Sequence, residues 1–196
     1  GVETGKPLAD TASYVAAMRA NERFGGPLPP IYLATLRNKM LQLATEISEG
    51  AIWANASLSH MSKQLSEVPN AVRDDFFLAN MIPTVIDDDV EAARAVNRRT
   101  LTGYVSLPNY RNYWRAAGYV EEMDAIEAAI EAGNKDILPS LMSDKWLDDN
   151  TISGSASHVR ARFEEWAHAG VTPIAVMSST TGGQVKAINQ LFDVYN

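Results

Sequence analysis

The stretch PIYLATLRNKMLQLA, residues 30–44, decides the fold class because its hydrophobic periodicity changes within three residues. Residues 31–36 form a short apolar run with prolines before it and charge after it, which predicts a strand covered on both faces. From Met40 onward, apolar side chains recur at the spacing of an amphipathic helix. Thr35 to Lys39 are therefore predicted to join a strand end to a helix start, where free backbone N–H groups and the helix dipole attract anions. Any loop between a strand and a helix shares this layout, so the spacing alone leaves an ordinary loop as the alternative.

Composition excludes several classes of protein. The chain has 196 residues, 46% of them hydrophobic, which is enough for one domain or for part of a larger one. It has no cysteine, which excludes a disulfide framework and thiol catalysis and fits a cytoplasmic protein. A net charge of −7 argues against nucleic-acid binding. We expect no membrane association, because no apolar run approaches the roughly 20 residues of a membrane span and no signal peptide is recognisable.

Strands and helices alternate along most of the chain, as expected of a parallel α/β fold. Strands are predicted near residues 31–36, 50–55, 76–86 and 171–177. Residues 105–150 differ, because they contain helical periodicity and a cluster of aromatic residues but no convincing strand. We interpret this segment as a helical insertion before the last strand. Its aromatic side chains are expected mainly to pack in the core, with a substrate entrance as the alternative.

Other polar clusters give weaker signals. The run Asp87 to Asp89 fits either a metal site or a helix start, and we favour the helix start, with Asp88 and Glu91 at capping-box spacing. No metal site is predicted, because the three histidines lack ligand spacing. Serine hydrolysis is not predicted either, because the serines at 153–157 do not match G-x-S-x-G.

Two further positions compete for a role in ligand binding. Gly182-Gly183, after the last predicted strand, forms a rival anion site, because α/β barrels often bind phosphate after their last two strands. Trp53 and Asn55 end the second predicted strand, at what would be the catalytic rim of a barrel. Their alternative interpretation is that Trp53 packs in the core and Asn55 only begins a loop.

Three segments together resemble one known family. They are PPIYLATLRNKMLQLATEISEGAIWAN (29–55), VIDDDVEAARA (85–95) and ISGSASHVRARFEEWAHAGVTPIAVMSS (152–179). These segments resemble the C-terminal half of the luciferase-like monooxygenase superfamily, the (β/α)8-barrel flavin enzymes, and above all the branch that uses coenzyme F-420. The resemblance implies that residues 1–196 form a single partial domain, the C-terminal half of a TIM barrel, with residues 105–150 as an insertion within it.

The resemblance also assigns the predicted turn to a cofactor. Family members commonly read Ala-Ala-Leu-Gly-Pro-Lys-Met where this chain has ATLRNKM at residues 34–40, so an Arg-Asn pair replaces Gly-Pro and adds a cation. The residues implied to contact the cofactor phosphate are Thr35, Leu36, Asn38 and Lys39, followed by Arg37. Trp53 and Asn55 complete the expected cofactor contacts. No catalytic acid or base can be named in this chain, because in the family those roles tend to come from the other half of the barrel.

The function implied by the resemblance is that of an oxidoreductase, with hydride transfer between coenzyme F-420 and a small organic substrate. An FMN-dependent monooxygenase is the first alternative, and a non-catalytic cofactor-binding or interaction module is the second. Four strands make only half of an eight-stranded barrel, and half a barrel leaves open sheet edges and an apolar face. We therefore expect a companion, either the missing N-terminal half of the barrel or a second copy of the chain in a homo-oligomer.

Overall fold

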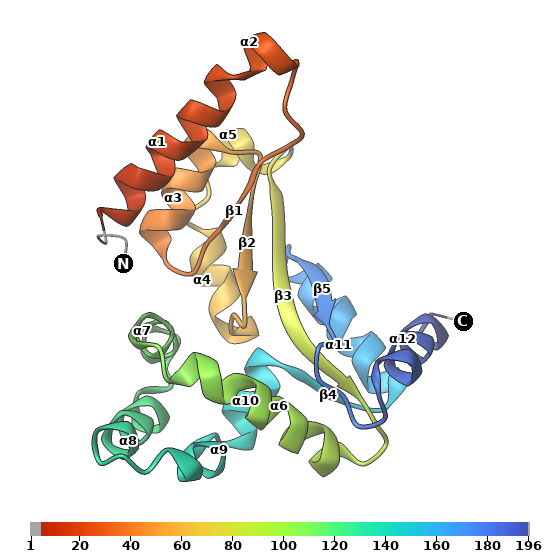
Figure 1. The fold of residues 1–196 in the computed structure, drawn as a ribbon. Helices are drawn as coiled ribbons and strands as arrows, with labels where there is room; N and C mark the ends of the chain where they lie inside the picture. Colours follow the sequence, from red (N-terminus) through yellow and green to blue (C-terminus); the bar gives the residue numbers. More distant parts are fainter. Residues whose placement is uncertain (1–4, 196) are drawn as a thin grey trace.

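The computed structural model describes residues 5–195 and shows an α/β fold built on one parallel sheet (Figure 1). Its strands are β1 (Tyr32–Ala34), β2 (Gly50–Ala54), β3 (Phe77–Ile86), β4 (Ile152–Gly154) and β5 (Thr172–Val176). The strand order is β1-β2-β3-β4, with β5 also paired to β3, and every pair is parallel. The predicted fold class is confirmed, and each of the four expected strands lies within its predicted range.

The short strand β4 corrects the predicted number of strands from four to five. It has three residues, and Ile152 is the only large apolar side chain among them. A strand of this length carries too little alternation to be recognised from its sequence. Ile152 pairs with Thr84 at the end of β3, while β5 pairs with an earlier part of the same strand.

Helices make up most of the rest of the chain. The α-helices are α1 (Pro7–Ala20), α2 (Glu22–Gly25), α3 (Asn38–Ile47), α4 (Met61–Leu65), α5 (Asn70–Arg73), α6 (Val90–Val105), α7 (Pro108–Ala116), α8 (Val120–Glu131), α9 (Leu138–Leu141), α10 (Asp144–Asn150), α11 (Ala156–His168) and α12 (Gln184–Asp193). Two 3-10 turns, η1 (Leu58–His60) and η2 (Lys135–Ile137), complete the set. Among residues 5–195, no helix combines the length and the apolar character needed to cross a membrane.

The sheet has one covered face and one open face over β1, β2 and the first part of β3. Leu33 and its register partner Ala51 are buried in the main core with side chains of α3. On the other face Tyr32 is 43% exposed and Met81 is 41% exposed. The ring of Tyr32 packs against that of Phe77 with their centroids 4.8 Å apart. We refer to Tyr32, Phe77 and Met81 as the open face.

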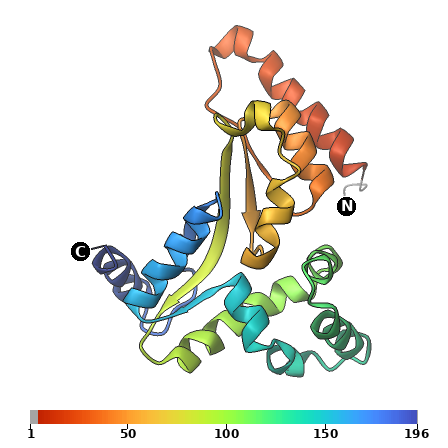
Figure 2. The same cartoon turned by 180° about the vertical axis from the view of Figure 1, so that it is seen from behind.

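The segment from α7 to α10 forms a helical cluster at one end of the sheet. Figures 1 and 2 show it at the end toward which β1 and β2 point, which is the end where the strands terminate. Trp114 of α7 and Trp146 of α10 are fully buried, with their rings edge to face and their centroids 4.8 Å apart. The aromatic residues of this segment therefore include core residues, as expected. The division of the chain into one partial domain with an insertion stays a prediction.

Candidate cofactor-binding site

The predicted anion turn lies between the end of β1 and the start of α3. The N–H group of Thr35 still pairs with β2, donating to a carbonyl oxygen at 2.9 Å. Helix α3 begins after Arg37, whose carbonyl oxygen accepts the N–H groups of Met40 and Leu41 at 3.0 and 3.2 Å. No acceptor in the described part of the chain takes the N–H groups of Arg37, Asn38 and Lys39. Three free N–H groups at a helix N-terminus form a potential anion site.

The Arg37-Asn38 pair fits this turn without backbone strain. Arg37 is extended at the N-cap position, with φ −127° and ψ 158°, a conformation open to any L-residue. Asn38 occupies the first helical position, where proline is favoured because the helix makes no use of that N–H group. Asn38 therefore stands at a position that would accept proline, and it has an N–H donor that proline lacks. The side chains of Arg37 and Lys39 are exposed, and neither forms an ion pair within residues 5–195.

Thr35 and Leu36 precede the N-cap residue, and their polar atoms differ in their hydrogen bonding. Thr35 is 4% exposed, and its hydroxyl has no hydrogen-bond partner among the described residues. A buried polar group without a partner lowers stability, so a ligand or water oxygen at this point would be favourable. The carbonyl oxygen of Leu36 accepts a hydrogen bond from Nε2 of Gln64 at 3.0 Å, which fixes the turn against α4.

Trp53 and Asn55 lie deeper than the rim position predicted for them. Trp53 is fully buried in the main core, where a ligand cannot reach it unless the covering residues move. Asn55 is 3% exposed and has a φ of 57°, the left-handed conformation that asparagine adopts more readily than most residues. Its carbonyl oxygen accepts the indole N–H of Trp114 at 3.2 Å. Both residues thus occupy structural positions, and their contact with a cofactor stays a prediction.

A buried hydrogen-bond network that the sequence does not reveal supports this end of the sheet. The hydroxyl of Tyr113 accepts the backbone N–H of Ser57 at 3.0 Å and donates to Oε1 of Gln64 at 3.1 Å. Oδ1 of Asn150 accepts both the Ser57 hydroxyl at 2.6 Å and the Trp114 indole N–H at 2.8 Å. All five residues are almost completely buried. Ser57 therefore joins the helical cluster to the end of β2.

Two tyrosines, one in this network and one nearby, remain neutral. Burial raises the pKa of Tyr113 well above its ordinary value. Burial also raises the pKa of Tyr119, and the carboxylate of Asp149, to which its hydroxyl donates at 2.8 Å, raises it further. Tyr113 therefore remains a hydrogen-bond donor to Gln64 over the ordinary range of pH.

The acidic run after β3 serves the helix start and a neighbouring loop. Asp89, rather than the predicted Asp88, caps α6 by accepting the N–H groups of Glu91 and Ala92. Asp87 accepts the hydroxyl of Thr181 at 2.5 Å and the N–H of Asp89 at 2.9 Å, and these bonds lower its pKa. The predicted capping box is therefore wrong by one residue, because the side chain of Asp88 is not the one that reaches the helix N–H groups. Within the part of the chain that is described, no group of three or more His, Asp or Glu residues could hold a metal ion.

The rival anion loop, which contains Gly182 and Gly183, directly precedes α12. Gly183 is the N-cap residue of α12 and has a φ of 85°, and Lys186 packs against Gly182. Thr181 of this loop is held by Asp87, so a carboxylate lies beside it. A neighbouring negative charge disfavours anions, and the turn at residues 35–39 is therefore the better anion site.

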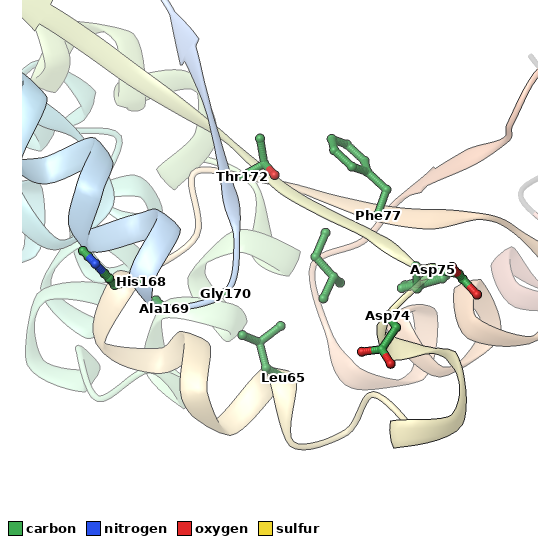
Figure 3. A pocket seen from close by; sticks show the side chains of 10 residues that line it. Leu65, Asp74, Asp75, Phe77, His168, Ala169, Gly170 and Thr172 are labelled. Carbon is green, nitrogen blue, oxygen red and sulfur yellow. The ribbon is translucent and has the colours of Figure 1, made fainter. Parts of the chain in front are cut away.

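A cavity of about 560 Å³ lies at the opposite end of the sheet (Figure 3). Its lining includes Phe77 and Thr172, the first residues of β3 and β5, together with Leu65 at the end of α4 and His168 at the end of α11. In α/β barrels the functional loops follow the carboxyl ends of the strands. This cavity is therefore separate from the candidate site.

Comparison with known protein families identifies the family of this chain. The family profile described as luciferase-like monooxygenase matches residues 5–173, which is most of the chain. The chain belongs to the luciferase-like monooxygenase family. The recognition made from the sequence is thereby confirmed. Comparison with curated proteins found no match.

Solved structures with similar folds include two F-420-dependent enzymes. The coenzyme F-420-dependent tetrahydromethanopterin reductase from Methanopyrus kandleri matches with a TM-score of 0.68 and 21% identity, over 83% of this chain and 48% of that protein. An F-420-dependent secondary alcohol dehydrogenase, solved with an F-420–acetone adduct, matches with a TM-score of 0.55 and 15% identity, over 85% of this chain and 47% of that enzyme. The chain thus spans about half the length of each of these two proteins. At this identity the likeness shows a shared fold, which is consistent with a partial TIM barrel.

Proposed function

We propose that this luciferase-like chain binds the phosphate of a flavin-type cofactor at the turn formed by residues 35–39. The observation that carries the proposal is the set of free N–H groups on Arg37, Asn38 and Lys39 at the start of α3. The buried, unpartnered hydroxyl of Thr35 and the exposed cation of Lys39 add one further donor and a positive charge. Phosphate is a ligand that matches donors of this kind.

We propose coenzyme F-420 as the cofactor and hydride transfer with a small organic substrate as the reaction. The two solved enzymes described above are named as F-420-dependent. The additional donor on Asn38 and the cation of Arg37 suit a cofactor tail that carries several negative charges. When bound, the cofactor would supply the redox chemistry, and the residues of this chain would hold and orient its phosphate. FMN, with monooxygenase activity, is the second candidate, because the matching family is described as luciferase-like monooxygenase.

We further propose that the open face is covered by other strands, either from an N-terminal half of the barrel or from a second copy. The two solved structures described above are each about twice as long as the region that matches. Tyr32, Phe77 and Met81 leave an apolar surface that such a partner would bury. Activity would then require the completed barrel, and the chain alone would only bind cofactor.

The test is to mix the purified protein separately with F-420 and with FMN and to measure quenching of cofactor fluorescence. We expect Lys39→Ala to weaken binding of whichever cofactor binds, because it removes the positive charge beside the phosphate. Lys135→Ala, an exposed lysine of η2, is the matched control and should bind like the wild type. Equal affinity of the Lys39→Ala variant and the wild type would refute the placement of the phosphate. Absence of binding by both cofactors would favour a non-catalytic interaction module.

A further inference from the structure

The helical cluster reaches the anion turn through two buried side chains. Tyr113 of α7 donates its hydroxyl hydrogen to Oε1 of Gln64 at 3.1 Å. Nε2 of Gln64 donates to the carbonyl oxygen of Leu36 at 3.0 Å. Tyr113 and Gln64 are each 1% exposed, so water does not compete for these bonds. The connection therefore runs from the segment 105–150 to the peptide that precedes the N-cap residue.

Fixing the Leu36 carbonyl also fixes a donor of the turn. The peptide unit is planar and trans, so the C=O of Leu36 and the N–H of Arg37 point in opposite directions. Because Gln64 holds the carbonyl oxygen, the Arg37 N–H group is directed away from α4. That N–H group is one of the three that find no acceptor among residues 5–195.

Each atom in the connection has one available orientation. Burial keeps Tyr113 protonated, and its hydroxyl already accepts the N–H of Ser57 at 3.0 Å, so its hydrogen is left for Gln64. Gln64 accepts that hydrogen through Oε1, which turns its NH2 group toward Leu36. The order of donors and acceptors thus orients the side-chain amide of Gln64 without ambiguity.

We propose that Gln64 and Tyr113 are positioning residues for the anion site, which they orient through the Leu36 carbonyl. This proposal rests on the proposed function, since it concerns the same turn. It gives the segment 105–150 a second role besides packing, because this segment sets the direction of a ligand-binding peptide. Neither side chain contacts the anion, so their effect on binding is transmitted through one hydrogen-bonded peptide.

The chain offers a closely matched control for the test. Tyr113→Phe and Gln64→Met each break the connection while keeping the shape of the side chain. Tyr119→Phe removes the hydroxyl of another buried tyrosine in the same helical segment, but that part-buried hydroxyl donates to Asp149 and does not lead to Leu36. A general loss of packing or stability would affect all three variants. A loss of positioning would affect only the first two.

The experiment is a titration of each protein with inorganic phosphate, followed by the backbone amide signals of residues 37–39 in two-dimensional NMR spectra. We expect the phosphate-free signal of Arg37 to shift in Tyr113→Phe and Gln64→Met, and phosphate binding to weaken about fivefold, the factor that corresponds to one net hydrogen bond. Tyr119→Phe should match the wild type in both respects.

The possible results separate this proposal from the one on which it rests. If the wild type binds phosphate, and Tyr113→Phe and Gln64→Met bind it equally well with unshifted Arg37 signals, the positioning role is refuted and the anion site stands. If Tyr119→Phe weakens binding as much as Tyr113→Phe, the effect is general and the positioning role is also refuted. If phosphate shifts none of these signals in the wild type, the anion site itself is refuted, and the positioning role falls with it.

Discussion

Replacing Asn38 with proline tests one backbone donor by itself, because it removes the N–H group of residue 38 and leaves the rest of the turn unchanged. The structure places Asn38 at the first position of α3, with its N–H group free. The preceding residue is extended, with φ −127° and ψ 158°, which is the conformation that a following proline requires. Asn38→Pro should therefore fold normally and lose one N–H donor. Asn38→Ala is the control, because it removes the side chain but keeps the N–H group.

The two expected effects have opposite signs. A proline at a compatible position raises the free energy of unfolding by about 0.5 kcal/mol, because it lowers the conformational entropy of the unfolded chain. For a chain of this size, that corresponds to a rise of about 1–2 °C in Tm. A hydrogen bond to a charged group contributes roughly 1.5 kcal/mol or more, so cofactor affinity should fall about tenfold relative to Asn38→Ala.

The assays are thermal unfolding by calorimetry and quenching of F-420 or FMN fluorescence. A fall in Tm of more than about 5 °C for Asn38→Pro would show that Asn38 is not at a free first helical position. Equal affinity of the proline and alanine variants would show that this N–H group does not contact the cofactor.

Three further predictions follow from the packing and the charges. Gly50→Ala should lower the free energy of unfolding by about 2 kcal/mol, because the added Cβ would lie 2.5 Å from the carbonyl oxygen of Phe77; Gly103→Ala, with nothing within 4 Å, is the control in thermal unfolding. Glu49 accepts the N–H of Ile31 at 2.7 Å, which lowers its pKa below the ordinary 4.5, so it stabilises the fold above pH 4.5 and this contribution disappears as pH falls through the lower value. In denaturant titrations, the free energy of unfolding should therefore fall less on acidification in Glu49→Gln than in the wild type. Identical pH profiles would contradict this role of Glu49. In sedimentation velocity the chain should associate as its concentration rises, and Met81→Lys should reduce this association; a wild type that stays monomeric at all concentrations would contradict the proposed partner face.

The sequence predicts the sheet well where strands are long or strongly apolar. The run at residues 31–36 is framed by prolines and charge, and the structure places β1 (Tyr32–Ala34) inside it. By contrast, β4 depends on pairing with β3 and has too few residues to show a pattern of its own. A strand can therefore be located from the sequence only when several local features, such as an apolar run and flanking prolines or charges, mark it.

The position of the turn is predictable from the sequence, but the hydrogen bonds that hold the turn in place are not. Thr35 to Lys39 lie where a strand period gives way to a helix period, which is a local property. The bonds from Tyr113 to Gln64 and from Gln64 to Leu36 join residues that are 49 and 28 positions apart. The aromatic cluster at residues 110–114 is the signal that marks Tyr113 in the sequence, and nothing local indicates its partner. The contacts of Trp53 and Asn55 with a cofactor, and a cytoplasmic location, stay predictions.

The most direct test of the central claim compares the affinities of FMN and riboflavin for the wild-type protein by fluorescence quenching. The two ligands share one ring system and differ in the phosphate. If residues 35–39 bind that phosphate, FMN should bind at least about tenfold more tightly than riboflavin, as expected from one charge-assisted hydrogen bond or more. Equal affinities, or tighter binding of riboflavin, would contradict the account.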